Sequence, residues 1–453
     1  MLIDICRCKT SLTDQAALTE WNGVIHGVLS HGQSGPVHLG ALLKAAPDYA
    51  MAHAARGLFS LMMGRRELVS VAHEANAAAQ RTLALGGATE RERLWCEALQ
   101  DWLTGHPSTA VARMERALRL NPADTISMKV SQGIRFIHGD SIGMLRSVEA
   151  VMAAHDTDHP LRGYAYGCRA FALEETGNYT EAERSGLAAL QAADDDAWGL
   201  HAVAHVYDMT NRPDQGIALI DQNNPAWSHC NNFRFHVWWH KALLILDQGD
   251  YAQVLDLYDT QIRSDKTDDY RDFSNASSLL LRLQLEGVDV GTRWNELADL
   301  AESRTTDGCL VFADLHYMLA LAGDNRHDAA ARLTARVARD AQAPGELAPI
   351  MGEPGVSAAR GLAAFGEGRY DLAFAHLRAA QPKFQNMGGS HAQRDIFERV
   401  TIEAGLRAGH LDATERLITE RNRLRADNVD AFAMSRLERI AAARAVQASV
   451  AAE

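Results

Sequence analysis

A short turn pattern recurs along the chain, and it restricts the fold more than any other feature of the sequence. It occurs in EETGNYTEAERSGLAAL (174–190), LDQGDYAQVLDLYD (246–259) and AFGEGRYDLAFAHLRAA (364–380). Each segment has a Gly, a Tyr two residues later, and then small or apolar residues at helical spacing. A Gly can adopt the left-handed conformation that ends one helix, and the next helix then folds back antiparallel to it. The pattern therefore predicts antiparallel helix pairs.

Equivalent turn residues can be followed along most of the chain. They are Gly64, Gly105, Gly139, Gly177, Asn211, Gly249, Gly287, Gly323, Gly368 and Gly409. The spacing ranges from 34 residues (Gly105 to Gly139) to 45 residues (Gly323 to Gly368), and a tetratricopeptide helix pair takes roughly 34 residues. Strand-like alternation of Val, Ile and Thr is nearly absent. We therefore expect an all-α, tetratricopeptide-like solenoid of roughly nine or ten helix pairs, each burying its apolar face against its neighbours.

The expected domain organisation is a capping segment over residues 1–40, followed by one continuous array over 41–453 with two insertions. Residues 342–357 (QAPGELAPIMGEPGVS) hold three prolines and three glycines, so they are expected to form a loop. Its apolar residues would otherwise be exposed together, so we expect the loop to pack over or beside the concave face. A second insertion, near 381–392, contains a Gly-Gly turn.

Charge and composition exclude several classes of protein. The net charge of -13 is spread along the chain, which argues against binding a nucleic acid. The six cysteines are scattered, so neither a disulfide framework nor a four-cysteine zinc site is indicated. The N-terminus lacks the features of a secretory signal, and no apolar run is long enough to span a membrane. We expect a soluble, cytoplasmic protein with reduced thiols, in which Asp194–Asp196 form a solvated loop; the oligomeric state stays open.

Four segments resemble the motifs of the tetratricopeptide repeat protein 38 family. They are HAVAHVYDM, HVWWHKALLILDQGDY, DLHYMLALAGD and GGSHAQRDIFE, and they occur in the same order in this sequence. The resemblance extends from about residue 40 to about residue 430. It implies an α-helical, tetratricopeptide-like solenoid and does not imply a particular reaction.

Two of these segments carry paired histidines. His201 and His205 are four residues apart, as are His236 and His240, so each pair projects from one face of a helix. Asp208 continues the first stripe. Both segments precede a turn and are therefore expected to be first helices, which line the concave surface of a tetratricopeptide array. We predict that all four histidines lie in one groove-facing pocket, with Tyr207 or Trp239 on the same side.

Three interpretations of the histidines stay open. They pack between helices and bond to backbone or water, or they bind a divalent metal ion, or one of them acts as a base in a metal-free site. The spacing of HAVAH resembles the helix of zinc proteases, but Ala202 stands where those enzymes need Glu, so a zinc protease is excluded. A catalytic histidine needs a carboxylate to orient it, and Asp208, Glu174 and Glu175 are the candidates. The reaction would be of hydrolase or lyase type.

Further side chains are predicted to line the groove and contact a ligand: Tyr164, Glu174, Trp198, Trp239, His316, His391 and Asp395. Asp314 and His316 are two residues apart, so we expect one to face the groove and the other to be solvated. Ser390 is expected to cap a helix. His391 and Asp395 are four residues apart, which could pair them.

Two functions follow from different classes of protein. One is a small-molecule site on the concave face, which would also convert its ligand. The other is a scaffold that binds a peptide or protein, which would need a ladder of basic and amide side chains. RDFSNASSLLLRLQL (271–285) supplies only Arg271, Asn275 and Arg282 to such a ladder. The sequence therefore favours the small-molecule site, and a divalent metal is the one cofactor it suggests. Nothing places Cys168 or Cys230 beside a histidine.

Overall fold

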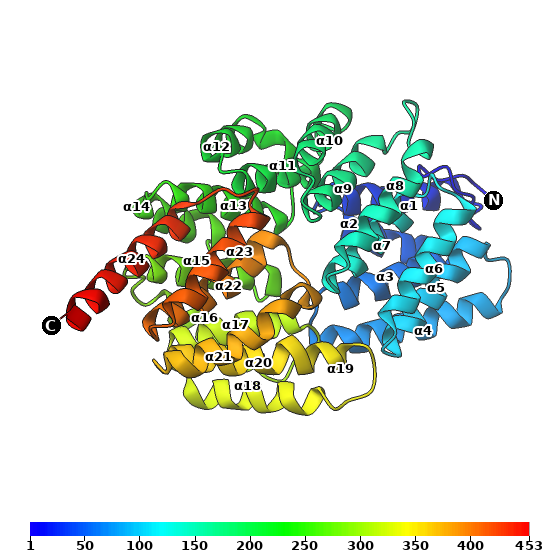
Figure 1. The fold of residues 1–453 in the computed structure, drawn as a ribbon. Coiled ribbons are helices and arrows are strands. Elements are labelled where there is room, and N and C mark those ends of the chain that lie inside the picture. The colour runs from blue at the N-terminus through cyan, green and yellow to red at the C-terminus, as the bar shows by residue number, and fades with distance from the viewer. Residues whose placement is uncertain (453) are drawn as a thin grey trace. The chain divides into compact units, whose positions relative to one another are not determined.

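The computed structural model describes residues 1–452, and 75% of the chain is helical (Figure 1). Among the described residues there is no β-strand, and only the isolated bridges Ile3–Lys9 and Gly32–Cys230 occur. The all-α class predicted from the turn pattern is confirmed. None of the described helices combines the length and the apolar character needed to cross a bilayer.

The chain forms two compact units, each assembled from separate stretches of sequence. The first comprises Met1–Val203, Asp221–Arg234 and Pro344–Leu347; the second comprises Ala204–Ile220, Phe235–Ala343 and the chain from Ala348 onward. The organisation expected from the sequence, a cap over residues 1–40 and a single array over 41–453, stays a prediction, and its last residue lies outside the described part.

The first unit is built from consecutive helix pairs. Its helices are α1 (Gln15–Leu29), α2 (Gly35–Ala45), α3 (Ala50–Met62), α4 (Arg66–Ala84), α5 (Glu90–Leu103), α6 (Pro107–Leu120), α7 (Thr125–Ile137), α8 (Ser141–Val151), α9 (Arg162–Glu174) and α10 (Tyr179–Ala192). Each odd-numbered helix packs against the even-numbered helix that follows it, and α3 also packs against α5 and α7 against α9. Trp21 lies at the centre of the core, edge-on to Tyr49 and Trp95.

Three helices, α11 (Ala197–Met209), α13 (Phe233–Asp247) and α19 (Leu347–Ile350), begin in residues of the first unit and continue in the second. The other helices of this half are α12 (Pro213–Gln222), α14 (Tyr251–Leu257), α15 (Tyr270–Leu285), α16 (Arg293–Ser303), α17 (Val311–Gly323), α18 (His327–Asp340), α20 (Ser357–Gly366), α21 (Tyr370–Ala380), α22 (His391–Arg407), α23 (Leu411–Leu424) and α24 (Ala431–Ala452). Helices α15, α17, α20 and α22 pack in a row, and α15 also packs directly against α22. These four first helices therefore surround a common interior.

Nine of the ten predicted turn residues have a left-handed backbone, with φ between 55° at Asn211 and 86° at Gly105. The exception is Gly323, which is the last residue of α17, and the left-handed residue of that turn is Asn325 at φ 56°. Gly323 is needed for packing instead, since a Cβ there would lie 2.6 Å from the ring of Trp294. The positions of the turns could thus be predicted from the glycines, except at Gly323, where the glycine is needed for close packing against Trp294.

The insertion at 342–357 is ordered differently from the expected loop. Residues 347–350 form α19. The following turn over Met351–Val356 is π-helical except at Glu353, where the backbone is extended (φ -145°, ψ 116°), and it packs against α18 and α20. Met351 is buried and Pro349 is exposed. Glu346, within the first unit, accepts hydrogen bonds from the Ser108 amide at 3.0 Å and the Ser108 hydroxyl at 2.6 Å. Its carboxylate therefore caps the positive N-terminal end of α6.

The second insertion agrees with the sequence prediction. A 3₁₀ segment, Gln381–Met387, leads into Gly388 and Gly389, which have φ of 80° and 77°. The Ser390 side chain accepts a hydrogen bond from the Gln393 amide and so caps α22. A Cβ at Gly389 would overlap the ring of Phe312. This turn therefore needs glycine both for its backbone angle and for the close approach of α17.

Candidate metal centre

Three of the predicted histidines meet inside the second unit. His205 comes from α11, and His236 and His240 come from successive turns of α13. One ring nitrogen from each lies within 4.8 Å of the others. The Nε2 atoms of His236 and His240 are 3.1 Å apart, and the ring centres of His205 and His240 are 4.3 Å apart. His205 and His240 are buried, while His236 keeps partial exposure.

His201 lies one turn before His205 on α11 and so extends the same helix face. Its ring contacts those of Phe171, Trp198 and Phe233 within the first unit, with ring centres 5.0 to 5.5 Å apart. His31 also stacks against Trp198 and against Phe233, with ring centres 5.4 and 4.4 Å apart. His201 is therefore embedded among aromatic rings, and its predicted role in the site stays a prediction.

A side chain that the sequence prediction did not include in the site orients His236. Asn275, on α15, is buried, and its Oδ1 accepts a hydrogen bond from His236 Nδ1 at 2.9 Å. An amide oxygen only accepts, so the proton of the neutral imidazole lies on Nδ1 and the lone pair on Nε2. His240 Nε2–H can then donate to His236 Nε2. A fixed partner on the outer ring nitrogen is the usual arrangement of a metal-binding histidine.

The surroundings keep these imidazoles neutral. Burial lowers the pKa of His236 to about 3, with His205 and Arg271 adding to the effect and the Asn275 hydrogen bond opposing it. Burial also lowers the pKa of His240 well below its ordinary value, and His205, His236 and Arg282 add to it. The neutral form is the one that binds a metal ion. His236 and His240 are therefore in their metal-binding protonation state at neutral pH.

Trp239 and Arg282 lie beside the cluster. The indole of Trp239 is fully buried and stacks on the His236 ring with 5.2 Å between centres. The Arg282 guanidinium lies 5.7 Å from the centre of the Trp239 ring. Within the described part of the chain, Trp239 Nε1 has no hydrogen-bond partner. Trp239 thus lies beside His236 and His240, and its indole N–H is a buried donor without an acceptor in the described part of the chain.

The nitrogen spacing suits a metal ion. With Zn–N bonds of about 2.0–2.1 Å, two ligands are about 3.3–3.4 Å apart in a tetrahedral complex and about 2.9 Å apart at a right angle. The observed Nε2–Nε2 distance of 3.1 Å lies between these values. A bound ion would replace the hydrogen bond between His236 and His240 without a large movement of either ring.

One interpretation required Asp208 to orient a histidine, but the observed contacts of Asp208 are with Arg425. Its Oδ1 accepts a hydrogen bond from the Arg425 guanidinium at 2.9 Å, and its backbone carbonyl accepts another at 2.7 Å. Asp208 is one turn from His205 but is held by the segment that precedes α24. The catalytic role predicted for Asp208 therefore has no support from its contacts.

Asp314 and His316 are both buried, so the expectation that one is solvated was wrong. The side chain of Asp314 forms an ion pair with Arg336 on α18, and burial raises its pKa to about 6. His316 Nδ1–H donates to the Phe312 carbonyl at 2.8 Å. The reason is that four helices, α15, α16, α18 and α20, pack against α17.

The expected pair of His391 and Asp395 does not form. Asp395 instead bonds to Arg399 and Arg421, at 2.6 Å each. His391 Nδ1 lies 3.4 Å from Arg394. A guanidinium is always charged and can bind a carboxylate with two hydrogen bonds, so it outcompetes an imidazole for the Asp395 carboxylate.

The remaining candidates belong to the first unit, and their predicted contacts with a ligand stay predictions. Tyr164 donates a hydrogen bond to Asp195 at 2.6 Å, and Glu174 is fully buried. Residues 194–196 form a loop in which Asp194 is exposed, as predicted, but the expectation that Asp196 is solvated was wrong, because it is only 1% exposed. Burial raises the pKa of Asp196 to about 7.

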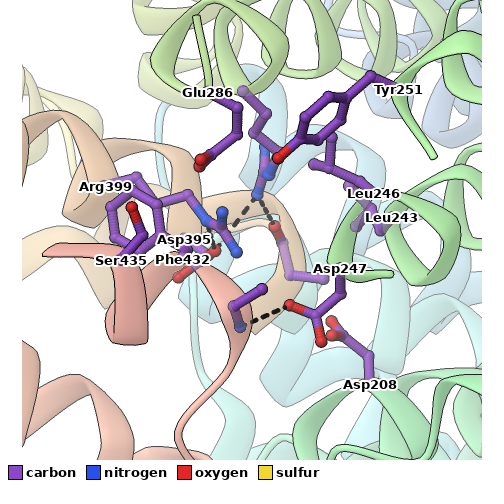
Figure 2. A pocket seen from close by; sticks show the side chains of 13 residues that line it. Asp208, Leu243, Leu246, Asp247, Tyr251, Glu286, Asp395, Arg399, Phe432 and Ser435 are labelled. Atoms are coloured by element: carbon purple, nitrogen blue, oxygen red, sulfur yellow. Dashed lines mark hydrogen bonds and ion pairs between the residues drawn. The ribbon is translucent and has the colours of Figure 1, made fainter. Parts of the chain in front are cut away.

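A cavity of about 140 Å³ lies within the second unit (Figure 2). It is lined by Asp208, Leu243, Leu246, Asp247, Tyr251, Arg282, Glu286, Ala392, Asp395, Arg399, Ala431, Phe432 and Ser435. Helix α13 connects it to the cluster, since Leu243 and Asp247 follow His236 and His240 along the same stripe. None of the three histidines lines the cavity. The sequence predicted one pocket lined by histidines, whereas the structure has a histidine cluster and, next to it along α13, a separate cavity.

No family model matches the sequence. The chain is similar to a chain in the solved structure of Naa15/Naa10 bound to HypK-THB, with 13% identity and a TM-score of 0.26. The similarity covers 90% of this chain and 64% of that one, so this chain spans less than two-thirds of its length. The resemblance to the tetratricopeptide repeat protein 38 family stays a prediction. The protein has an all-α fold of consecutive helix pairs, and its second unit contains a histidine cluster.

Proposed function

We propose that the protein binds a zinc ion through His205, His236 and His240 and uses it to activate water for the hydrolysis of a small molecule. The observation that supports this most is the pairing of His236 and His240, whose Nε2 atoms are 3.1 Å apart, with Asn275 fixing the tautomer of His236. Without a metal ion, the neutral imidazoles of His236 and His240 share one weak hydrogen bond. With a zinc ion, each of the three imidazoles would form a strong bond to the metal.

The donor set favours zinc over iron. Non-haem iron sites commonly use two histidines and a carboxylate, and Asp208, the acidic residue of α11, is engaged by Arg425. Three histidines and an open fourth position are the ligand set of hydrolytic zinc. Zinc at such a site lowers the pKa of its bound water to about 7.

Metal analysis tests the proposal directly. The full-length protein would be freed of metal with a chelator, titrated with Zn²⁺ and analysed after gel filtration. We expect a single zinc ion per chain in the wild type and loss of binding in His205→Ala and His240→Ala. His159→Gln is the matched control, because His159 is a buried histidine of the first unit that bonds to the Ala123 carbonyl. Equal zinc binding by all variants, or none by the wild type, would refute the metal site.

The catalytic part of the proposal has a separate test. Zinc-loaded and metal-free protein would be compared on small nitrophenyl esters and phosphate esters. Hydrolysis that appears with zinc and disappears in His240→Ala supports the reaction class. Zinc binding without any hydrolysis would support the metal site and refute the proposed hydrolytic activity.

A further inference from the structure

The cavity of the second unit has a size and a lining that suit a particular chemical class of ligand. Its volume of about 140 Å³ is close to that of an engineered cavity of about 150 Å³ that binds benzene. A ligand core of about six non-hydrogen atoms therefore fits. Figure 2 shows charged side chains of both signs around this space, from α11, α13, α15 and α22.

The positive end of the lining is Arg282. Its side chain is 1% exposed and donates to the Ala392 carbonyl at 2.7 Å. Its nearest carboxylate is Asp395, at 3.6 Å. Asp395 is already bonded to Arg399 and Arg421 at 2.6 Å each, so it neutralises Arg282 poorly. Consistent with this, burial lowers the pKa of Arg282 to about 9.

The negative end is Asp247. Its carboxylate accepts a hydrogen bond from the Ala431 amide at 3.0 Å, and no basic side chain of the described residues pairs with it. The other acids of the lining are matched: Asp208 pairs with Arg425 and Glu286 pairs with Arg436. Burial raises the pKa of Asp247, and the neighbouring Asp430 and Asp208 add to the effect. This carboxylate therefore lacks a counterion.

Arg282 and Asp247 thus face one cavity with opposite charges, and no ion pair joins them within the described chain. A buried charge without a partner is costly. A lone anion would leave Asp247 without a counterion. A lone cation would leave Arg282 with only Asp395, whose carboxylate is shared with Arg399 and Arg421. We propose that the cavity binds a small zwitterion of the α-amino acid class, with its carboxylate on Arg282 and its ammonium group on Asp247.

This binding site is distinct from the proposed metal site, because its lining contains none of the three histidines. The proposal therefore does not depend on zinc, and the test is run on metal-free full-length protein. Glycine, L-alanine and L-serine are the probes. Propionate and L-alaninamide are the matched ligands, since the first lacks the ammonium group and the second lacks the carboxylate.

Isothermal titration calorimetry would measure binding. We expect at least one zwitterion to bind, and its affinity to exceed that of propionate and of alaninamide by about tenfold to a hundredfold, as expected for one lost charge-assisted hydrogen bond. Asp247→Asn should weaken zwitterion binding by a similar factor, while the affinity for propionate stays the same or rises, because the variant removes a negative charge from the same cavity. The amide keeps an acceptor for the Ala431 amide, so the fold is retained, and thermal melting would verify this.

Asp412→Asn is the control variant, because Asp412 is an exposed acid paired with Arg444 far from the cavity lining. It should bind the zwitterion as the wild type does. Propionate binding as tightly as alanine would reduce the site to a simple anion site and overturn the proposal. Absence of binding by all three probes, or unchanged affinity in Asp247→Asn, would overturn it as well.

Discussion

The side chains of His236 and Asn275 are joined by a hydrogen bond of 2.9 Å, although 39 residues separate them in the sequence. The bond connects α13 to α15 and fixes which nitrogen of His236 is free. In metal sites such outer partners affect affinity by about 10- to 100-fold. Asn275 is therefore expected to contribute to zinc binding without touching the ion.

We predict that Asn275→Ala lowers zinc affinity by about tenfold to a hundredfold, because the His236 ring loses its orienting partner. Asn275→Asp should restore or strengthen binding, since a carboxylate accepts the same hydrogen bond and makes the imidazole more basic. Competition with a chromophoric chelator measures both. Asn295→Ala, on the exposed surface of α16, is the control. Equal affinity of Asn275→Ala and the wild type would show that Asn275 has only a packing role.

The ion-pair network around Asp430 is predicted to stabilise the second unit. Asp430 is 1% exposed and bonds to Arg421 at 2.6 Å and Arg399 at 3.2 Å. Asp430→Asn removes the negative charge that these buried guanidinium groups bind. It should therefore lower the free energy of unfolding by about 3–5 kcal/mol. Urea unfolding measures the change. Asp412→Asn, an exposed acid, should change the free energy of unfolding by less than about 0.5 kcal/mol, and similar losses in both variants would contradict the prediction.

A pH-dependent loss of stability is predicted from Asp196. Its pKa in the folded protein is about 7, against an ordinary value of 3.8, so the neutral acid is the form that the fold prefers. Its contribution to stability is complete below pH 3.8 and is lost as pH rises to about 7.

Asp196→Asn should therefore raise the free energy of unfolding at pH 8 by on the order of 2 kcal/mol relative to the wild type. Near pH 4.5 the two proteins should differ much less. Thermal melts across this range measure the difference, and Asp194→Asn is the control. A gain that is equal at both pH values would point to packing instead of ionisation.

Gly389→Ala is predicted to destabilise the second unit by about 1–3 kcal/mol. The residue has φ of 77°, and a Cβ would overlap Phe312. Gly40→Ala is the matched control, because Gly40 lies in α2 and a Cβ added there would meet nothing within 4 Å. It should be neutral or stabilising by about 0.5–1 kcal/mol. Chemical unfolding of both variants provides the comparison.

The helix pairs were predictable because their turns depend on local chemistry. Gly177, Gly249 and Gly368 occupy the left-handed region, and that requirement is visible in the sequence. The histidine pairs were visible for the same reason, since four-residue spacing places two side chains on one face of a helix. These features depend on neighbours in the sequence and on the geometry of a single helix.

The partners of the site residues were not predictable, because they depend on how helices distant in the sequence align. Asn275 meets His236 only through the relative positions of α13 and α15. Asp208 meets Arg425 across 217 residues. The repeat pattern predicts that helices pack side by side and does not specify their register to within one turn. The expected partners of Asp208 and Asp395 were wrong for this reason.

The segment Pro344–Leu347 has a consequence for biosynthesis. It belongs to the first unit although the residues on either side belong to the second. Most of the first unit has left the ribosome once residue 234 has been added, yet Glu346 caps α6 through Ser108. Over a hundred further residues are therefore synthesised before the first unit receives its last segment, Pro344–Leu347. A chain that stops before residue 344 lacks this segment altogether.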